Sequence, residues 1–355
     1  MRSIVVTGAS SGIGAALARR AAANGWAVLA VARRGDRLEA LVREIVAGGG
    51  RCEMLVADVL WNTAPQTIVD RAMRAFDRLD VVVNNAGSAH ASNLLEESDA
   101  EIERQWQLHL GAPLRIARAA LPQIERVHGG LVFFGSGLAR VPSPGYGAYA
   151  PAKAAIRAAT TQLRRELRGR GVFVTYVDPG VVDTEFSRAS GMEERPASWH
   201  AKPDAVAAAI LRGIEHRAPR VNAVPWQTAA TALGEWLPGL ADRVMASFVT
   251  PPAPASALPA PVVEMPVPGS VPSSFEAALE PLYRRMERVK LPLSFVRSLL
   301  VPQTTFDLND AAMRWAGMPN KNERAAMHEV FDALTQAGFL ESNGAEGWRV
   351  LRGPD

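Results

Sequence analysis

Cysteine is almost absent from this 355-residue chain, and so are long apolar runs and an excess of charge of one sign. With Cys52 as the only cysteine, neither an intrachain disulfide nor a cysteine-rich metal site can form, and no metal site is predicted. The sequence contains no run of 18 or more apolar residues, so no membrane span is predicted. A net charge of +3 supplies no strong field for polyanions, so nucleic acid is not an expected partner.

The first residues, MRSIVVTG, lead straight into an expected strand. They have neither the apolar length nor the small-residue cleavage site of a signal peptide, so we expect a cytoplasmic protein. Hydrophobic residues make up 48% of the chain, which is ample for a buried core. The length predicts about two domains.

Short apolar runs alternate with segments of helical periodicity from Arg2 to about Met245. Several runs are β-branched and apolar on both faces, as parallel strands covered by helices are. The helical segments include Ile13–Asn24 and Arg37–Ala47. This order predicts an α/β fold with a doubly wound parallel sheet, the Rossmann fold. The expected strands are Ser3–Thr7, Ala27–Ala32, Arg51–Ala57, Val81–Asn84, Gly130–Phe134 and Val172–Val177.

A glycine-rich turn, Thr7 to Gly14, follows the first expected strand and opens a helix. Glycines permit a tight turn and let backbone N–H groups approach a pyrophosphate, while the helix dipole attracts the anion. A glycine-rich turn without a ligand is the alternative. The residues expected to bind a dinucleotide here are Gly8, Ser10, Ser11, Gly12, Ile13 and Gly14.

The end of the second expected strand indicates which dinucleotide is bound. An acidic residue there would bind the ribose 2′-hydroxyl of NAD, but this chain has Ala32 followed by Arg33 and Arg34. Guanidinium groups suit a 2′-phosphate by charge and by bidentate geometry. The sequence therefore predicts NADP(H) in preference to NAD(H), with a solvated basic helix start as the alternative.

Five motifs follow one another along the chain: the glycine-rich turn, Asn84-Asn85-Ala86-Gly87, Ser136, Tyr149-Ala150-Pro151-Ala152-Lys153 and Pro179-Gly180-Val181-Val182-Asp183-Thr184. Their order and spacing resemble the short-chain dehydrogenase/reductase family over about residues 1–245. The resemblance implies a homodimer or tetramer formed through the helices containing Gln105–Leu121 and Tyr149–Leu167.

The resemblance also implies further contacts to the dinucleotide. Asp58 and Val59 would contact the adenine, although Asp58 alone could be an ordinary strand-end turn. Three residues would line the adenosine side and support the sheet: Asn85, Ala86 and Gly87. Four would hold the nicotinamide ring and its amide: Pro179, Gly180, Val182 and Thr184.

Tyr149 and Lys153 are four residues apart, which places them on one face of a helix. A neighbouring ammonium favours the phenolate, so we expect the pKa of Tyr149 to lie below its usual value near ~10. The phenol would then exchange a proton with a carbonyl or alcohol oxygen. Ser136 would hydrogen-bond the substrate oxygen, and Lys153 would also bind the nicotinamide ribose. Tyr146 has no lysine four residues on and is expected to line the pocket rim.

His109 stands where family members usually have an asparagine that anchors a water to the lysine. Neutral imidazole can both donate and accept, so one hypothesis makes His109 part of a proton relay. The other makes it a packed side chain that binds the backbone.

The segments after residue 184 are expected to form the substrate pocket. Glu185–Lys202, with Phe186, Met192 and Trp199, is expected to be a mobile lid with an apolar underside. Trp226 and Trp236 follow, with an amphipathic stretch at Thr231–Phe248. This stretch is expected to pack in the core, while lining the pocket, covering the sheet edge and touching a membrane surface stay open as alternatives. An apolar lining would favour a hydrophobic ketone or an acyl-type carbonyl.

Residues 250–274 are dense in proline, alanine and serine and predict a semi-extended linker between domains at 1–249 and 275–355. A helix is expected at Phe275–Val289. Beyond it, two helices, a turn between them and a hairpin together resemble a winged-helix domain. These elements are Leu308–Ala316, Gly317–Asn320, Lys321–Ala337, and a hairpin of Phe339–Glu341 with Trp348–Leu351 that turns at Asn343–Gly344.

Two functions compete on this sequence. The first is an NADPH-dependent carbonyl reductase or alcohol dehydrogenase. The second is a cofactor-binding sensor or scaffold whose C-terminal domain binds a partner or DNA. Residues 275–355 carry ten basic and eleven acidic side chains, whereas DNA-binding domains show a basic face, so a protein partner or self-association is favoured.

Overall fold

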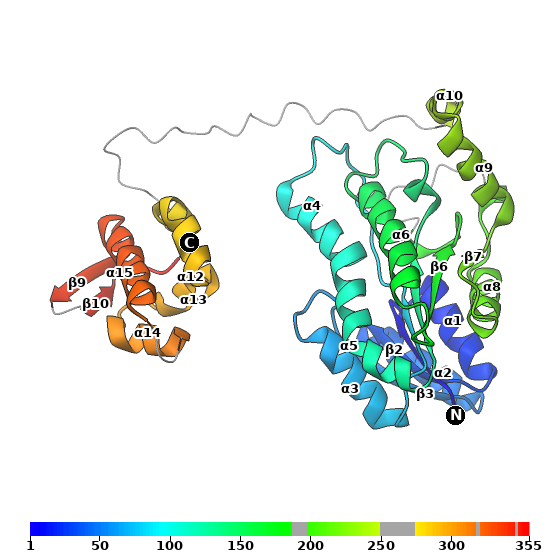
Figure 1. The fold of residues 1–355 in the computed structure, drawn as a ribbon, viewed down its shortest axis with the longest axis horizontal. Helices are drawn as coiled ribbons and strands as arrows, with labels where there is room; N and C mark the ends of the chain where they lie inside the picture. The colour runs from blue at the N-terminus through cyan, green and yellow to red at the C-terminus, as the bar shows by residue number, and fades with distance from the viewer. Residues whose placement is uncertain (187–196, 249–273, 317–319, 345–346, 355) are drawn as a thin grey trace. The chain divides into compact units, whose positions relative to one another are not determined.

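The computed structural model describes residues 1–186, 197–248, 274–316, 320–344 and 347–354 (Figure 1). The chain divides into two compact units, Met1–Ala257 and Leu258–Asp355. Apart from Ser274, the expected linker 250–274 lies outside the described residues. No helix within the described ranges is long and apolar enough to cross a membrane.

Seven parallel strands form the sheet of the N-terminal unit, in the order β3-β2-β1-β4-β5-β6-β7. Four of the six predicted strands have the predicted bounds. β3 ends one residue early, and β6 both begins and ends one residue late. The three residues of β7 were not predicted, because so short a strand shows no periodicity. The strands are β1 (Ser3–Thr7), β2 (Ala27–Ala32), β3 (Arg51–Val56), β4 (Val81–Asn84), β5 (Gly130–Phe134), β6 (Phe173–Asp178) and β7 (Arg220–Asn222).

Helices cover both faces of this sheet, which confirms the Rossmann-like α/β fold (Figure 1). Every residue of β1, β2, β4 and β5 is buried, as expected of strands with two apolar faces. One face packs against α1 (Gly12–Ala23), α2 (Gly35–Ala47) and α8 (Pro203–Glu215). The other packs against α3 (Ala64–Phe76), α5 (Ala112–Arg126) and α6 (Tyr149–Glu166).

The strand order reverses direction between β1 and β4, and ligands of such sheets bind in the crevice at that point. The helix expected through Gln105–Leu121 is interrupted there. It consists of α4 (Asp99–Trp106), one π-helical turn at Gln107–Gly111 and α5. The π turn carries His109 beside the crevice, and such turns often mark functional sites.

The stretch Thr231–Phe248 belongs to two helices, α9 (Pro225–Trp236) and α10 (Pro238–Phe248). Pro238 forces the break, because proline cannot continue a helix that precedes it. The expectation that this stretch packs in the core is wrong. Trp236 is 82% exposed, Leu233 is 57% exposed, and several other side chains face a cavity described below.

The C-terminal unit has its own apolar core and a three-stranded antiparallel sheet, β8-β10-β9. The single helix predicted at 275–289 is wrong, because a 3₁₀ turn at Glu280–Leu282 interrupts it. The strand β9 continues through Asn343–Gly344, so these residues do not turn the hairpin. The elements are α11 (Phe275–Leu279), α12 (Tyr283–Val289), α13 (Leu293–Leu299), β8 (Thr305–Asp307), α14 (Leu308–Ala316), α15 (Lys321–Gln336), β9 (Leu340–Gly344) and β10 (Gly347–Val350).

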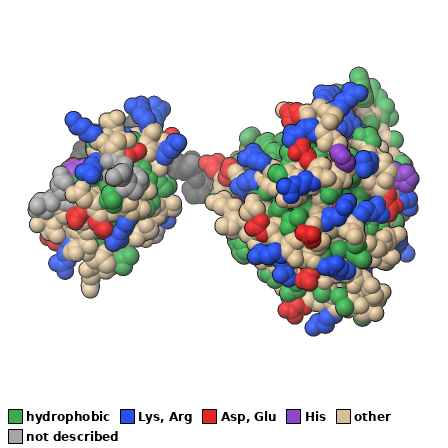
Figure 2. Space-filling view, turned by 60° about the horizontal axis from the view of Figure 1, so that its bottom comes forward, with side chains coloured by type: hydrophobic (Ala, Val, Ile, Leu, Met, Phe, Trp, Pro, Cys, Tyr) green, Lys and Arg blue, Asp and Glu red, His purple; other side chains and the backbone are tan. Residues whose placement is uncertain are grey.

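Side chains of both charge signs are mixed over the face of each unit shown in Figure 2. In the C-terminal unit, basic side chains often stand beside acidic ones, as in the pairs Arg285–Glu329 and Arg314–Asp310. The face shown in Figure 2 is therefore not uniformly basic over the described residues, unlike the face that DNA-binding domains present.

Candidate active site

A cavity of about 740 Å³ lies in the N-terminal unit. The loops that follow β1, β2, β3, β4, β5 and β6 line it, together with α9 and α10. Every residue that the sequence assigned to cofactor binding or catalysis lines this one cavity. In chain order they are Gly8, Ser10, Ser11, Gly12, Ile13, Gly14, Arg33, Arg34, Asp58, Val59, Asn85, Ala86, Gly87, His109, Ser136, Tyr149, Lys153, Pro179, Gly180, Val182 and Thr184.

The glycine-rich turn is shaped so that only glycine fits at two of its positions. Gly8 has φ +70°, a left-handed conformation, and a Cβ on Gly14 would collide with the carbonyl oxygen of Gly8 and the side-chain amide of Asn85. Asn85 braces the turn, because its Nδ2 donates to the carbonyl oxygen of Thr7 at 2.8 Å. The α1 N-terminus that follows points at the cavity, so the turn fits the pyrophosphate of a dinucleotide.

The loop after β6 is fastened by a residue that the sequence analysis missed. The buried Gln227 accepts from the backbone N–H of Val181 at 2.7 Å and donates to the carbonyl oxygen of Trp199 at 2.7 Å. Gly180 has φ +69°, and this allows the chain to turn there. No pattern within one sequence marks Gln227, since it lies 46 residues beyond Val181, whose N–H it binds.

Arg33 and Arg34 both border the cavity but have different partners. Arg33 is an exposed side chain whose Nη1 lies 3.7 Å from a carboxylate oxygen of Asp58. Arg34 donates to the hydroxyls of Ser10 and Ser11, at 2.9 and 2.7 Å, and to Glu185 at 2.8 Å. The guanidinium of Arg34 is therefore held beside the glycine-rich turn, close to where the cofactor would lie.

Tyr149 is the first residue of α6, and Lys153 lies one helical turn further on. Both are buried, and the Lys153 ammonium nitrogen lies 5.5 Å from the centroid of the Tyr149 ring. Lys153 donates to the carbonyl oxygen of Phe134 at 2.9 Å. Ser136 follows β5 and hydrogen-bonds with Tyr149 through its side chain. The structure thus brings together the three groups predicted from their spacing.

The predicted direction of the Tyr149 pKa is wrong. Burial raises the pKa of Tyr149 above its usual value of 10, and the hydrogen bond with Ser136 offsets this only in part. Burial also lowers the pKa of Lys153 to about 7, so at neutral pH the ammonium is only partly charged. The sequence argument treated both groups as if they were in water, whereas desolvation dominates here. The phenol therefore stays in its protonated form at neutral pH, but its raised pKa makes it a weaker acid than a tyrosine in water.

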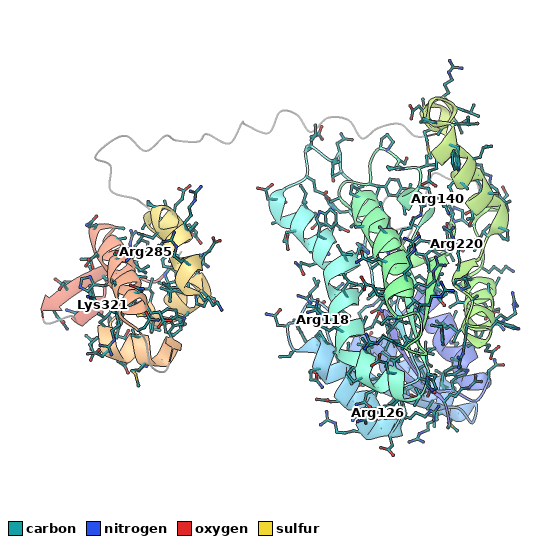
Figure 3. The ribbon with its side chains drawn as sticks, in the orientation of Figure 1. Arg118, Arg126, Arg140, Arg220, Arg285 and Lys321 are labelled. Atoms are coloured by element: carbon teal, nitrogen blue, oxygen red, sulfur yellow. The ribbon has the colours of Figure 1, made fainter. Side chains whose placement is uncertain are left out.

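Tyr176, on β6, binds the backbone of Ser136, and the sequence analysis did not predict this contact. Its hydroxyl accepts from the backbone N–H of Ser136 at 3.3 Å, and a Cβ on Gly135 would collide with its ring. The guanidinium of Arg220, labelled in Figure 3, lies 5.3 Å from the same ring. Burial raises the pKa of Tyr176 to about 12, so its hydroxyl stays protonated.

His109 lies edge-on to the Tyr149 ring at a centroid distance of 4.9 Å. Its Nε2 is 2.8 Å from the carbonyl oxygen of Ser88, so Nε2 carries the proton and donates. Nδ1 is then the acceptor, and it is buried with no hydrogen-bond partner among the described residues. Burial and the charge of Lys153 hold the pKa of His109 well below its usual value, so the imidazole is neutral.

The part of the cavity beyond Tyr149 has an apolar lining. Phe186 packs 5.8 Å from the Tyr149 ring, and Trp199 packs 5.6 Å from Trp226. Tyr146 also lines the cavity. Met192 and the rest of 187–196, within the expected lid, lie outside the described residues. The helices α9 and α10 add Ala230, Leu233, Leu240, Ala241, Val244 and Met245.

The chain is similar to known dehydrogenases and reductases. The short chain dehydrogenase family profile matches residues 2–195. A short chain dehydrogenase of Pseudocercospora fijiensis is 38% identical over 188 residues, 52% of this chain and 60% of that protein. Sulfoacetaldehyde reductase 2 of Chromohalobacter salexigens is 35% identical over 187 residues, 52% of this chain and 74% of that protein. The crystal structure of L-sorbose reductase from Gluconobacter frateurii, complexed with NADPH and L-sorbose, superposes with a TM-score of 0.57 at 26% identity, covering 62% of this chain and 95% of that one.

The Rossmann-like fold and the similarity to known reductases and dehydrogenases define an NAD(P)-dependent oxidoreductase that acts on CH–OH groups. The chain belongs to the short chain dehydrogenase family. The family profile ends before α8, so it does not extend to the C-terminal unit.

Proposed function

We propose that this protein is an NADPH-dependent reductase of hydrophobic ketones or acyl-type carbonyls, with Tyr149 as the proton donor. The observation that carries the proposal is a buried, protonated phenol between Ser136 and Lys153, facing a cavity that is apolar on its far side. In the reverse direction, the same group would take the proton of an alcohol.

The bound cofactor would supply the hydride that adds to the carbonyl carbon. Tyr149 then donates its proton to the carbonyl oxygen, and the Ser136 hydroxyl stabilises the charge that develops there. Lys153 would hold the ribose next to the nicotinamide. Pro179, Gly180, Val182 and Thr184 would hold the nicotinamide ring itself. His109 would complete the relay, because its unpartnered Nδ1 can accept a proton through a water.

The adenosine half of the cofactor would lie over the first three loops. Asp58 and Val59 would contact the adenine, and Asn85, Ala86 and Gly87 would line the adenosine side. The pyrophosphate would bind the N–H groups between Gly8 and Gly14. The guanidinium groups of Arg33 and Arg34 would bind the 2′-phosphate, which favours NADP(H) over NAD(H).

The test is NADPH oxidation against a panel of ketones, aldehydes and acyl thioesters of increasing chain length. Turnover should be fastest with apolar carbonyl compounds. In Tyr149→Phe, the rate of NADPH oxidation should fall by about 100-fold or more. Tyr146→Phe is the matched control, since Tyr146 lines the same cavity but has no lysine partner, and it should remain active. A Tyr149→Phe variant as fast as the parent would remove Tyr149 from the mechanism.

We also propose that residues 275–355 form a winged-helix domain that binds a protein partner or a second copy of this chain. Two helices, α14 and α15, followed by the β9–β10 hairpin support the winged-helix assignment. The mixture of basic and acidic side chains argues against DNA. The test is retention on immobilised DNA at increasing salt concentration. If the full chain is retained in a salt-dependent way and a chain ending at residue 249 is not, the C-terminal domain binds DNA.

Assembly into a homodimer or tetramer would use the helices α4, α5 and α6. Arg118 on α5 and Arg164 on α6 lie exposed on the outer sides of these helices. Light scattering of the full chain and of a chain ending at residue 249 would give the assembly state and show whether the C-terminal unit contributes to it.

A further inference from the structure

Glu185 occupies two arginines at the cofactor end of the cavity. Its Oε2 accepts from Arg34 at 2.8 Å, and its Oε1 accepts from Arg37. Arg34 precedes α2 and Arg37 lies in its first turn, whereas Glu185 follows the loop after β6. The pairing therefore joins two segments that are about 150 residues apart in sequence.

This pairing lies where a 2′-phosphate would bind. Arg34 and Glu185 both line the cavity, and Arg34 is fixed there by the hydroxyls of Ser10 and Ser11 in the glycine-rich turn. A carboxylate and a phosphate monoester satisfy a guanidinium in the same way, through two parallel N–H···O bonds. The two anions therefore compete for the same donors, and they would repel each other if both were present.

We propose that Glu185 is a specificity-determining residue that acts as an internal counter-anion for Arg34 and Arg37 and must be displaced by the 2′-phosphate of NADP(H). The proposal rests on the assignment of Arg34 to the 2′-phosphate and adds Arg37 to it. NAD(H) has no such phosphate, so its binding leaves Glu185 in place. Glu185 thus lowers the affinity for NADP(H) without affecting NAD(H).

A phosphate can replace the Glu185 carboxylate because the three side chains are partly exposed to solvent. The side chains of Arg34, Arg37 and Glu185 are all about two-fifths exposed, at 42%, 43% and 41%. Ion pairs this exposed contribute little net free energy, so a ligand phosphate of higher charge can replace the carboxylate. The two arginines lower the pKa of Glu185 to about 2, so the carboxylate stays ionised throughout the working pH range.

The experiment measures binding of adenosine 2′,5′-bisphosphate and of AMP to the full chain by calorimetry, which does not depend on turnover. Glu185→Gln should bind the bisphosphate about three- to tenfold more tightly than the parent, with AMP unchanged. Arg37→Met should weaken binding of the bisphosphate and leave the affinity for AMP unchanged.

Asp204→Asn is the matched control. Asp204 is an exposed carboxylate that pairs with Arg20 on α1 and does not line the cavity, so this change removes one negative charge at a different place. It should leave both affinities as in the parent. If Glu185→Gln gains no more bisphosphate affinity than Asp204→Asn, the counter-anion role is excluded.

The same binding data test the NADP(H) preference and the role of Glu185 separately. If the parent protein binds AMP as tightly as the bisphosphate, the protein has no preference for NADP(H). Glu185 would still be a counter-anion if Glu185→Gln then bound the bisphosphate more tightly than AMP, because the carboxylate would have masked that preference in the parent.

Discussion

The imidazole of His109 meets the ring of Tyr149 edge to face, at 4.9 Å and an interplanar angle of 89°. One nitrogen of His109 is bound to Ser88, and the other has no hydrogen-bond partner among the described residues. A side chain that only packed against Tyr149 would not need a nitrogen at the position of Nδ1. This unpartnered acceptor beside the phenol favours the relay hypothesis over a purely packing role.

We predict that His109→Asn lowers kcat by about tenfold or more and shifts its apparent pKa, because the shorter amide cannot donate to the Ser88 carbonyl and place an acceptor at the position of Nδ1 at the same time. The pKa of His109 lies well below 6.5, so the parent profile should show no inflection from this imidazole near neutral pH. The measurement is kcat from pH 5 to 10. If His109→Asn reproduces the parent's rate and apparent pKa values, His109 has no relay role.

His109→Phe serves as the control for packing. It keeps an aromatic ring against Tyr149 but leaves the Ser88 carbonyl without its donor. It should therefore be at least as slow as His109→Asn, because it removes both nitrogens of the imidazole.

Lys153 is predicted to destabilise the fold at neutral pH. Its pKa of about 7 in the folded state lies below the 10.5 of the unfolded chain, so between these values the unfolded state binds more protons. Stability from this group therefore rises with pH from about 7 to 10.5. Lys153→Met should raise the unfolding free energy at pH 7 by roughly a few kcal/mol while abolishing turnover.

The gain from Lys153→Met should shrink as pH approaches 10.5, and denaturant unfolding at pH 7, 8.5 and 10 measures it. Lys202→Met is the control, because Lys202 is exposed and its removal should change little at any pH. A stability gain that does not depend on pH would mean that added apolar packing, rather than relief of a buried ammonium, is responsible.

Motif positions could be read from the sequence, whereas their electrostatics could not. Most strand bounds followed from periodicity. Many of the cavity-lining residues followed instead from the resemblance to a known family, and they meet in one cavity because parallel strands end at one edge of the sheet. The direction of the Tyr149 pKa depended on burial that only the fold reveals. Gln227, Tyr176 and Glu185 were missed for a related reason: each acts across a long sequence separation, and no local pattern marks such a partner.

Gly14→Ala is predicted to abolish dinucleotide binding and to lower stability by about 1–3 kcal/mol, because the added Cβ meets the backbone of Gly8 and the Asn85 amide. Thermal unfolding and NADPH fluorescence titration measure the two effects. Gly239→Ala is the matched control, since a Cβ there meets nothing within 4 Å. Parent-like NADPH affinity in Gly14→Ala would mean that the glycine-rich turn does not hold the cofactor.

Tyr176→Phe is predicted to slow catalysis without weakening cofactor binding. It removes one buried hydrogen bond to the Ser136 backbone, worth about 1 kcal/mol, so kcat should fall about fivefold. The Ser136 side chain lowers the pKa of Tyr149, so a misplaced Ser136 should also move the apparent pKa of kcat upward. A merely structural role would lower stability and leave this pKa unchanged. Tyr146→Phe, which also contacts the Tyr149 ring, should leave the rate near that of the parent and should not raise the apparent pKa.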